Sequence, residues 1–443
     1  MGLTLWNIAD RVRDSDPYTG IWSPEDVPHK QELVAKLISL YPNHFKDRNL
    51  TVLQAPGRAE VGHINHGDYC GLETIVMPIN RGVIAVFAPN DEGVVRVASD
   101  GFGLAELPFS DAATGTGWEN YLATTVRRAA INFPGELRGF DMAMVSDLSN
   151  NGGMSSSSAV MITYFLATMI TNGLETHPAF AENIKGLGDL ILYTGAMECG
   201  NDFRTLAGET GVGTKGGSQD HAVILAGEQG YLTGFVTCPE VKRVRRMAFP
   251  EDLAIIVAET GAEANKTGDA QTPYNDVAGR AGRTLEAVND EFGGPAAQTV
   301  AEMISRAGAY LDYMINAVGG DAERIRHCVE MKGQLPFFVR AMEGRDYKFA
   351  GELMTRAHHL SGDCLGNTTP EMTRVIYQAI REGAYGGVVN GAGFGGTVTI
   401  LAPADKAVRI ADGMPGSFVV PKPAAGVSTM FTKRGVSSYI RVG

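Results

Sequence analysis

The sequence has little cysteine and no paired cysteine motif. Its five cysteines are scattered over 443 residues, are odd in number, and include no Cys-x-x-Cys pair. Such a set does not suit a disulfide framework or a structural zinc site, and it is typical of proteins in a reducing compartment. We therefore expect a cytoplasmic protein.

Long apolar runs and a cationic leader are also missing. The longest apolar run, Val160 to Ile170, is shorter than the roughly 20 residues that a helix needs to cross a bilayer. The first ten residues have neither a cationic start nor a continuous apolar segment, so no signal peptide is expected. These two features predict a protein without a membrane partner.

Net positive charge is the third thing that the chain lacks. The formal charge is −12 and the isoelectric point is near 5.3. A general nucleic-acid binder needs a basic surface that replaces counterions, so no nucleic-acid partner is expected. With 44% hydrophobic and 20% charged residues the composition is that of a globular protein, and the length suggests two or three domains. The oligomeric state stays open between monomer and homodimer.

The chain does contain an unusual glycine- and serine-rich stretch between a strand-like segment, 142–146, and an apolar helical pattern. The stretch includes Gly152, Gly153, Ser155, Ser156, Ser157 and Ser158. Glycines allow a backbone to approach a ligand closely, and the start of a helix offers unpaired N–H groups to an anion. Such clusters are also common in turns and linkers. The stretch is a candidate phosphate site, with a simple turn as the alternative.

Apolar periodicity predicts a mixture of strands and helices. Strands are predicted at 50–54, 82–88, 93–98, 142–146, 232–236, 253–258 and 397–401. Helices are predicted at 32–41, 118–132, 184–198, 276–291, 299–317, 321–343 and 371–382. Residues 55–58, Ala-Pro-Gly-Arg, are predicted to form a turn. The pattern favours an α+β protein with a division near residues 230–240.

Two glycine patterns have little value as nucleotide motifs. Residues 211–216 and 391–396 both match G-x-G-x-x-G, but neither lies between a predicted strand and a predicted helix. Residues 208–215 nearly form a Walker A loop, with Thr214 and Lys215 in the wrong order. Neither a dinucleotide fold nor a P-loop is predicted.

Three loops taken together are more informative. They are residues 55–71, the serine-rich stretch, and Asn390-Gly-Ala-Gly-Phe-Gly-Gly396. In this order they resemble the signature segments of the GHMP small-molecule kinases, most closely those of the galactokinase branch. Further similar segments are 118–121, 209–221 and 353–358, so the resemblance spans about residues 50 to 400. It implies an N-terminal ribosomal-protein-S5-like domain, residues 1–235, a C-terminal ferredoxin-like domain, residues 236–443, and an active site between them.

The resemblance also implies roles for individual residues. Asp220 matches the family's catalytic base, and Arg58 matches the arginine beside it. Glu209 and Ser157 match the ligands of Mg²⁺, which accompanies ATP as the co-substrate. The implied sugar-binding residues are Asn65, His66, Asp68 and Tyr274. The implied nucleotide-binding residues are the six of the serine-rich stretch together with Trp118 and Tyr121.

The implied activity is transfer of a phosphoryl group from ATP to the anomeric hydroxyl of a monosaccharide, galactose or a relative. Asn65 stands where the family has a glutamate that contacts a substrate hydroxyl, so this position leaves the identity of the sugar open. Two alternatives also remain. One is a GHMP kinase for a non-sugar alcohol such as mevalonate, and the other is a catalytically silent sugar sensor of the same fold.

Overall fold

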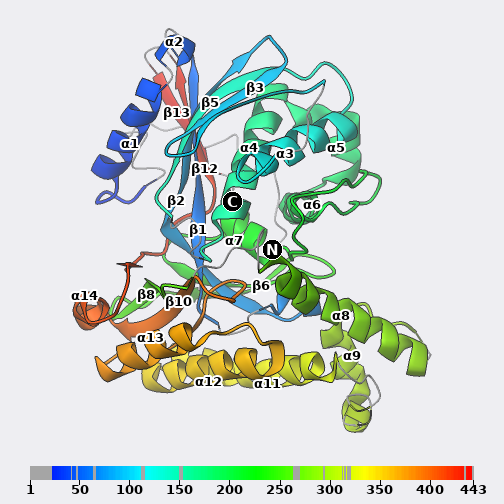
Figure 1. Ribbon diagram of the computed structural model, residues 1–443, viewed down its shortest axis with the longest axis vertical. Helices are drawn as coiled ribbons and strands as arrows, with labels where there is room; N and C mark the ends of the chain where they lie inside the picture. The colour runs from blue at the N-terminus through cyan, green and yellow to red at the C-terminus, as the bar shows by residue number, and fades with distance from the viewer. Residues whose placement is uncertain are drawn as a thin grey trace.

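The computed structural model describes residues 22–443, except residues 41, 46–47, 63–65, 111–114, 149–152, 263–269, 293–294, 312, 314–315, 317–320, 434–435 and 442–443. Within these residues the chain forms a nine-stranded sheet and a four-stranded sheet, each covered by helices. Figure 1 shows the larger sheet in the upper part of the molecule and the smaller one below it. No helix in the described part of the chain has the length and apolarity to cross a membrane.

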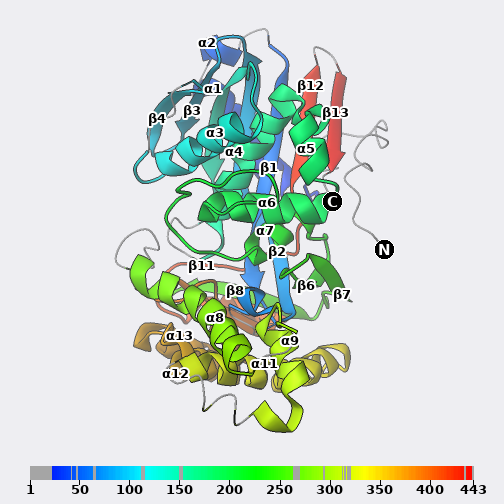
Figure 2. The same ribbon diagram turned by 90° about the vertical axis from the view of Figure 1, so that its right-hand side faces the viewer.

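The larger sheet is built on two long strands and is mostly antiparallel. Its main path runs β13-β12-β1-β2-β5-β3-β4, and β6 joins β2 and β7 at the side. The strands are β1 (Leu50–Glu60), β2 (Thr74–Asn90), β3 (Val94–Ser99), β4 (Gly103–Pro108), β5 (Gly139–Ser146), β6 (Tyr231–Val236), β7 (Lys242–Ala248), β12 (Ser428–Lys433) and β13 (Val436–Arg441). Figure 2 shows the red strands β12 and β13 beside the blue β1, so the last strands of the chain return to its first.

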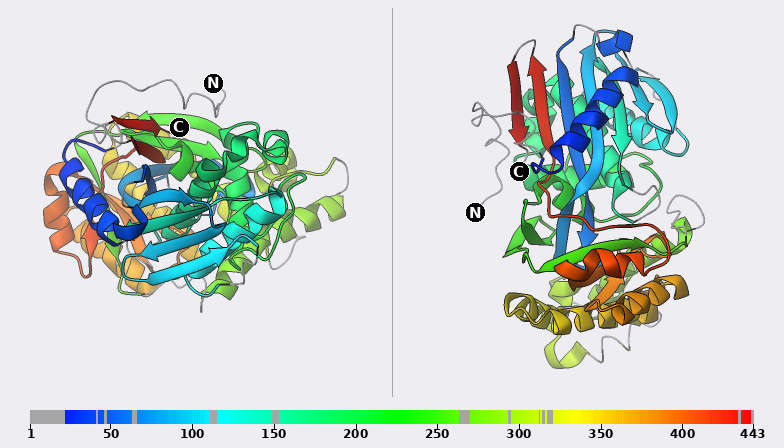
Figure 3. Two further views of the ribbon diagram at one scale, coloured as in Figure 1. Left: turned by 90° about the horizontal axis from the view of Figure 1, so that it is seen from above. Right: turned by 90° about the vertical axis from the view of Figure 1, so that its left-hand side faces the viewer.

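Alternation along β1 and β2 gives this sheet two buried faces. Val52 and Ile84 pack in one cluster with the helix α1, whereas Leu53 and Ala85 point to the other side. Figure 3 shows α1 lying across the first face. The helices of this half are α1 (Val27–Leu40), α2 (Pro42–Phe45), α3 (Glu119–Asn132), α4 (Ser156–Asn172), α5 (Pro178–Asn183), α6 (Leu187–Cys199) and α7 (Gln219–Ala226). The second face is covered by α3, α4, α6 and α7.

The smaller sheet carries the second core. Its order is β11-β8-β10-β9, antiparallel throughout, with β8 (Leu253–Glu259), β9 (Gly386–Val389), β10 (Thr397–Pro403) and β11 (Phe418–Val419). The helices of this half are α8 (Gln271–Phe292), α9 (Val300–Ala307), α11 (Ala322–Glu343), α12 (Tyr347–Leu365), α13 (Pro370–Arg381) and α14 (Ala407–Asp412). The expected α+β class with two domains is confirmed.

Several local expectations need correction. Residues 55–58 are not a turn, because β1 continues to Glu60 through a bulge between Pro56 and Arg58. The helix predicted at 299–317 is interrupted: α9 ends at Ala307, Gly308 has φ +51°, and a 3-10 turn at Gly308–Tyr310 precedes further helical residues from Leu311. The predicted division at residue 235 stays a proposal, since β7 and β12, which both follow it, hydrogen-bond within the larger sheet.

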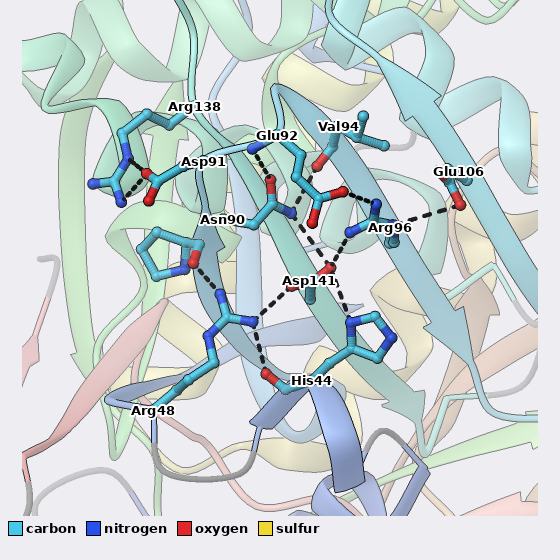
Figure 4. Close-up of polar contacts among 11 residues, drawn as sticks. His44, Arg48, Asn90, Asp91, Glu92, Val94, Arg96, Glu106, Arg138 and Asp141 are labelled. Atoms are coloured by element: carbon cyan, nitrogen blue, oxygen red, sulfur yellow. Dashed lines mark hydrogen bonds and ion pairs between the residues drawn. The ribbon is translucent and has the colours of Figure 1, made fainter.

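A polar cluster lies between the strands of the larger sheet, towards the end of β2. The carboxylate of Asp141, on β5, is 2% exposed and accepts hydrogen bonds from Arg48 at 2.7 Å and from Arg96 at 3.2 Å. The amide of Asn90 donates to it at 3.3 Å, and Nδ1 of His44 lies 3.5 Å away. Figure 4 shows these side chains converging on the single carboxylate. One buried acid thus ties α2 and the segment after it to three strands.

Candidate active site

Arg58 is positioned by the bulge in β1. A bulge re-aims the side chains of its strand, and here the backbone N–H of Arg58 donates to the carbonyl of Met154 at 3.1 Å. A Cβ atom on Gly57 would lie 2.8 Å from the same carbonyl oxygen. Glycine at position 57 therefore lets β1 approach the serine-rich stretch.

The guanidinium of Arg58 joins three segments that are far apart in the sequence. Its Nε donates to Oδ1 of Asp220 at 2.8 Å, and its Nη1 donates to the carbonyl of Gly153 and, at 3.4 Å, to Oδ1 of Asn390. The Arg58 side chain is 2% exposed. Burial by itself lowers the pKa of Arg58, but the charges of Asp220 and Glu60 outweigh burial and raise it. Arg58 is thus a fixed cation beside the Asp220 carboxylate.

The loop after β9 packs against the serine-rich stretch. The amide of Asn390 donates to the carbonyl of Gly153 at 3.3 Å and to Oγ1 of Thr397 at 3.1 Å. A Cβ atom on Gly153, whose φ is +63°, would lie 2.7 Å from the carbonyl oxygen of Asn390. The two loops therefore touch through their backbones, and this contact joins the two halves of the molecule beside Arg58.

The serine-rich stretch leads into α4, a helix of 17 residues. Ser155 precedes the helix at φ +62°, and its buried Oγ has no hydrogen-bond partner among the described residues. Further along, Ser157 is in hydrogen-bond contact with the hydroxyl of Tyr121. The start of this helix, with the orphaned hydroxyl of Ser155, fits a phosphate group.

The side chains of Ser158 and Glu198 bring together, in the cavity, two oxygen atoms of the kind that binds Mg²⁺. Oγ of Ser158 donates to Oε2 of Glu198 at 2.8 Å, and Nε2 of His221 lies 3.1 Å from the same oxygen. The side chain of Glu198, at the end of α6, is 11% exposed. A hydroxyl and a carboxylate that point at one another suit Mg²⁺, which keeps few protein ligands when it is bound to nucleotide phosphates.

Glu209 lies elsewhere. Its carboxylate accepts hydrogen bonds from Arg127 at 3.0 Å and from the backbone N–H groups of Thr210, at 2.9 Å, and Gly211, at 3.0 Å. Glu209 does not line the cavity that contains Asp220. Because its oxygens are engaged by the loop and by α3, the proposal for a metal-binding carboxylate moves from Glu209 to Glu198.

The part of the site that is expected to bind the sugar contains Asp68, His66, Tyr69 and Tyr274. Asp68 accepts a hydrogen bond from the backbone N–H of Tyr69 at 3.1 Å, and Nε2 of His66 is 3.0 Å from the carbonyl oxygen of Ala392. The hydroxyls of Tyr69 and Tyr274 are 2.9 Å apart. Burial, together with the nearby charge of Asp220, raises the pKa of Asp68 to about 6. Asp68 is therefore a carboxyl group in a desolvated, hydrogen-bonding pocket.

A cavity of about 600 Å³, including its open mouth, connects these groups. Of the residues expected from the sequence, it is lined by Arg58, His66, Asp68, Tyr121, Ser157, Ser158, Asp220 and Tyr274. Gly153, Ser155, Ser156 and Trp118 are not among its lining residues, and Trp118 instead has its ring 6.4 Å from that of Phe102. Asn65 and Gly152 lie outside the described residues.

Several residues that line the cavity were not expected from the sequence. Among them are Glu60, Glu198 and Gln219. Gln219 precedes Asp220 directly, and Glu60 is two positions after Arg58 on the same strand, so both could have been found by their closeness to a candidate residue. Glu198 carried a weaker signal, because it lies far from Asp220 in the sequence.

Comparisons with a family model, with curated relatives and with solved structures all point to the GHMP kinases. Residues 338–420 match the model of the GHMP kinases C-terminal domain. The galactokinase of Mycobacterium bovis (strain BCG / Pasteur 1173P2) is 27% identical over 373 residues, which cover 81% of this chain and 90% of that protein. The galactokinase of Glaesserella parasuis serovar 5 is 25% identical over 380 residues, 83% of this chain and 88% of that protein.

A solved structure has the same fold. The crystal structure of Lactococcus lactis galactokinase complexed with galactose superposes with a TM-score of 0.72 over 90% of this chain and 99% of that chain, at 19% identity. The GHMP kinase fold expected from the sequence is therefore confirmed. The chain therefore contains a GHMP kinase C-terminal domain and is similar over most of its length to the galactokinases.

Proposed function

We propose that the protein transfers the γ-phosphoryl group of ATP to the anomeric hydroxyl of a monosaccharide, galactose or a relative. The observation that carries this proposal is the contact of 2.8 Å between Arg58 Nε and Asp220 Oδ1, in a cavity that lies between the serine-rich stretch and Asp68. Asp220, paired with the Arg58 cation, thus lies between residues suited to bind phosphate and residues suited to bind hydroxyl groups. We also propose that the reaction takes place in the cytoplasm, because the cysteines are scattered and form no paired motif.

Asp220 is the proposed base. The oxygen of the anomeric hydroxyl attacks the γ-phosphorus and forms a new P–O bond, while the bond to the bridging oxygen of ADP breaks. The hydroxyl proton passes to the Asp220 carboxylate. A carboxylate is a weak base, with a reference pKa near 3.9, so it assists mainly when the hydroxyl becomes acidic late in the transfer. Asp220 is on the first turn of α7 and is 19% exposed, and so it can reach an acceptor in the cavity.

Arg58 has two proposed tasks. It keeps Asp220 ionised by direct pairing, and it balances the negative charge that spreads over the transferring phosphoryl group. Its contacts with Gly153 and Asn390 fix the guanidinium, so it does not need to reorganise during the reaction.

The residues present fit Mg²⁺ and ATP. Ser158 and Glu198 would hold the metal ion, and the start of α4 with Ser155 would hold the phosphates. When bound, Mg²⁺ supplies charge neutralisation on the phosphate oxygens. Asp68, His66 and Tyr274 would hold acceptor hydroxyls through hydrogen bonds, with Asn65 as a further candidate from the sequence.

The proposed function is tested by ADP release with Mg²⁺ and ATP against a panel of monosaccharides, mevalonate and homoserine. We expect turnover with at least one monosaccharide and no turnover with the matched 1-O-methyl glycoside, which has no anomeric hydroxyl. Phosphorus NMR of the product should show a sugar 1-phosphate. Equal turnover of the methyl glycoside would contradict transfer to C1, and turnover of mevalonate alone would favour the non-sugar alternative.

A further inference from the structure

The Arg58–Asp220 pair has a competitor next to it. Oε1 of Glu60 lies 3.6 Å from Nη2 of Arg58, and both side chains are buried, with 8% and 2% of their surface exposed. A buried carboxylate pairs strongly with an arginine when their geometry allows it. Glu60 could therefore draw the guanidinium away from Asp220, which accepts a hydrogen bond from Nε.

Gln219 restrains Glu60. Its Nε2 donates to the same oxygen, Oε1 of Glu60, at 2.7 Å, and its side chain is buried. The amide oxygen of Gln219 has no hydrogen-bond partner in the part of the chain that the structure describes. This buried amide is thus directed at Glu60 as a donor, at the cost of an unsatisfied acceptor.

The backbone of Gln219 is fixed as well. Its N–H donates to Oδ2 of Asp68 at 3.3 Å, and the backbone N–H of Glu60 donates to Oδ1 of Asn390 at 3.0 Å. Both partners of the Gln219–Glu60 contact are therefore anchored to the cavity wall.

We propose that Gln219 is a positioning residue that holds the carboxylate of Glu60 away from Arg58, so that the guanidinium stays on Asp220. This inference rests on the proposed function, in which the Arg58–Asp220 pair performs the phosphoryl transfer. Without the Gln219 donor, the Glu60 carboxylate has the guanidinium 3.6 Å away as a charged partner and moves onto it. Asp220 then loses its cation and its fixed orientation.

The test is a double-mutant cycle of Gln219→Leu and Glu60→Gln, with kcat and KM measured on an acceptor that the wild type turns over. Gln219→Leu should lower kcat by about 100-fold, the scale of a misplaced catalytic group, with both KM values within about threefold. Glu60→Gln keeps a hydrogen-bond acceptor for Gln219 but removes the competing charge, and it should retain kcat within about fivefold.

The double variant gives the decisive result. Since no carboxylate is left to capture Arg58, we expect the double variant to recover to within about tenfold of the wild type and to exceed Gln219→Leu alone. A merely structural role for Gln219 would give losses that add, and a double variant no faster than Gln219→Leu would overturn the proposal. Gln334→Leu, a change at an equally buried glutamine on α11, is the matched control and should leave kcat unchanged.

Crystal structures of the same variants give a second readout that does not depend on turnover. In Gln219→Leu, or in Gln219→Met if the leucine variant does not fold, the distance from Arg58 to Glu60 should shorten and the 2.8 Å contact with Asp220 should lengthen. An unchanged Arg58 in these structures would overturn the proposal. If the wild type turns over no acceptor, the proposed function fails, while these structures still decide the pairing.

Discussion

Two aspartates of this molecule, Asp220 and Asp141, are both paired with arginine, yet their surroundings point to different tasks. Asp141 is one carboxylate shared by two guanidinium groups and an amide, with 2% of its side chain exposed. Asp220 shares its arginine with Glu60 and is 19% exposed on a cavity. A carboxylate that accepts hydrogen bonds from several donors holds strands together. A carboxylate that faces a cavity and is paired with one arginine among the described residues can also bind a substrate.

The largest effect in this comparison is expected at Arg58. Arg58→Gln removes the cation beside Asp220, and we expect kcat to fall by about 1000-fold, the scale of a lost transition-state donor. The measurement is steady-state ADP release with the best acceptor of the panel. Arg96→Gln, beside Asp141, is the control and should keep kcat near that of the wild type. Equal losses in both variants would remove the distinction between the two regions.

At Asp141 the effect should appear in stability. Asp141→Asn leaves two arginines without their shared counter-charge, and we expect the free energy of unfolding to fall by about 3 kcal/mol. Urea unfolding followed by circular dichroism measures this change. An Asp141→Asn protein as stable as the wild type would show that the cluster in Figure 4 contributes little.

Two glutamates extend the same contrast. Glu198→Gln removes a proposed metal-binding carboxylate, and the Mg²⁺ concentration for half-maximal rate should rise by about 30-fold. Glu209→Gln changes a carboxylate that is engaged by Arg127 and the loop, so it should leave the Mg²⁺ dependence unchanged. A shifted Mg²⁺ dependence in Glu209→Gln alone would restore the assignment made from the sequence.

The smallest expected effect concerns Asp68. Its pKa is raised from 3.8 to about 6 in the folded protein, so the native state binds its proton more tightly than the unfolded chain does. Stability therefore falls as pH rises from about 4 to 6 and stays at the lower level above that range. Asp68→Asn should flatten this slope and, after the loss of one accepted hydrogen bond, stabilise the protein at pH 7.5 by on the order of 1 kcal/mol.

Thermal unfolding between pH 4 and pH 8 measures the effect of Asp68, and an unchanged slope in Asp68→Asn would contradict it. Activity should change in the opposite direction. Because ionised Asp68 is the better hydrogen-bond acceptor, the KM for the acceptor should fall in the wild type as pH rises through about 6.

The sequence predicts elements with a strong local pattern. The helix α4 and the strand β8 are continuous apolar segments, and both are found where they were expected. β12 was not expected, because its position depends on pairing with β1 across most of the chain. Pairing with a strand so distant in the sequence cannot be predicted from the local pattern of apolar residues.

The site shows the same limit. Arg58 and Asp220 were chosen from motifs, and the structure brings them into contact. Glu209 was assigned as a metal ligand from its motif, and the sequence does not show that Arg127 engages it. Likewise, the sequence does not show that Gln219 donates to Glu60. Local motifs select the right loops, but the use of each carboxylate depends on which cation or donor the fold places beside it.

In our proposal, Asp220 acts on a substrate, whereas Asp141 stabilises the fold. The most direct test of this claim is kcat/KM for Asp220→Asn and Asp141→Asn in one assay, at a temperature at which both variants are folded. We predict a loss of about 1000-fold for Asp220→Asn with a melting temperature near that of the wild type. Asp141→Asn should keep kcat/KM within about threefold and melt earlier. An Asp220→Asn protein that keeps kcat/KM within about tenfold of the wild type would contradict the claim.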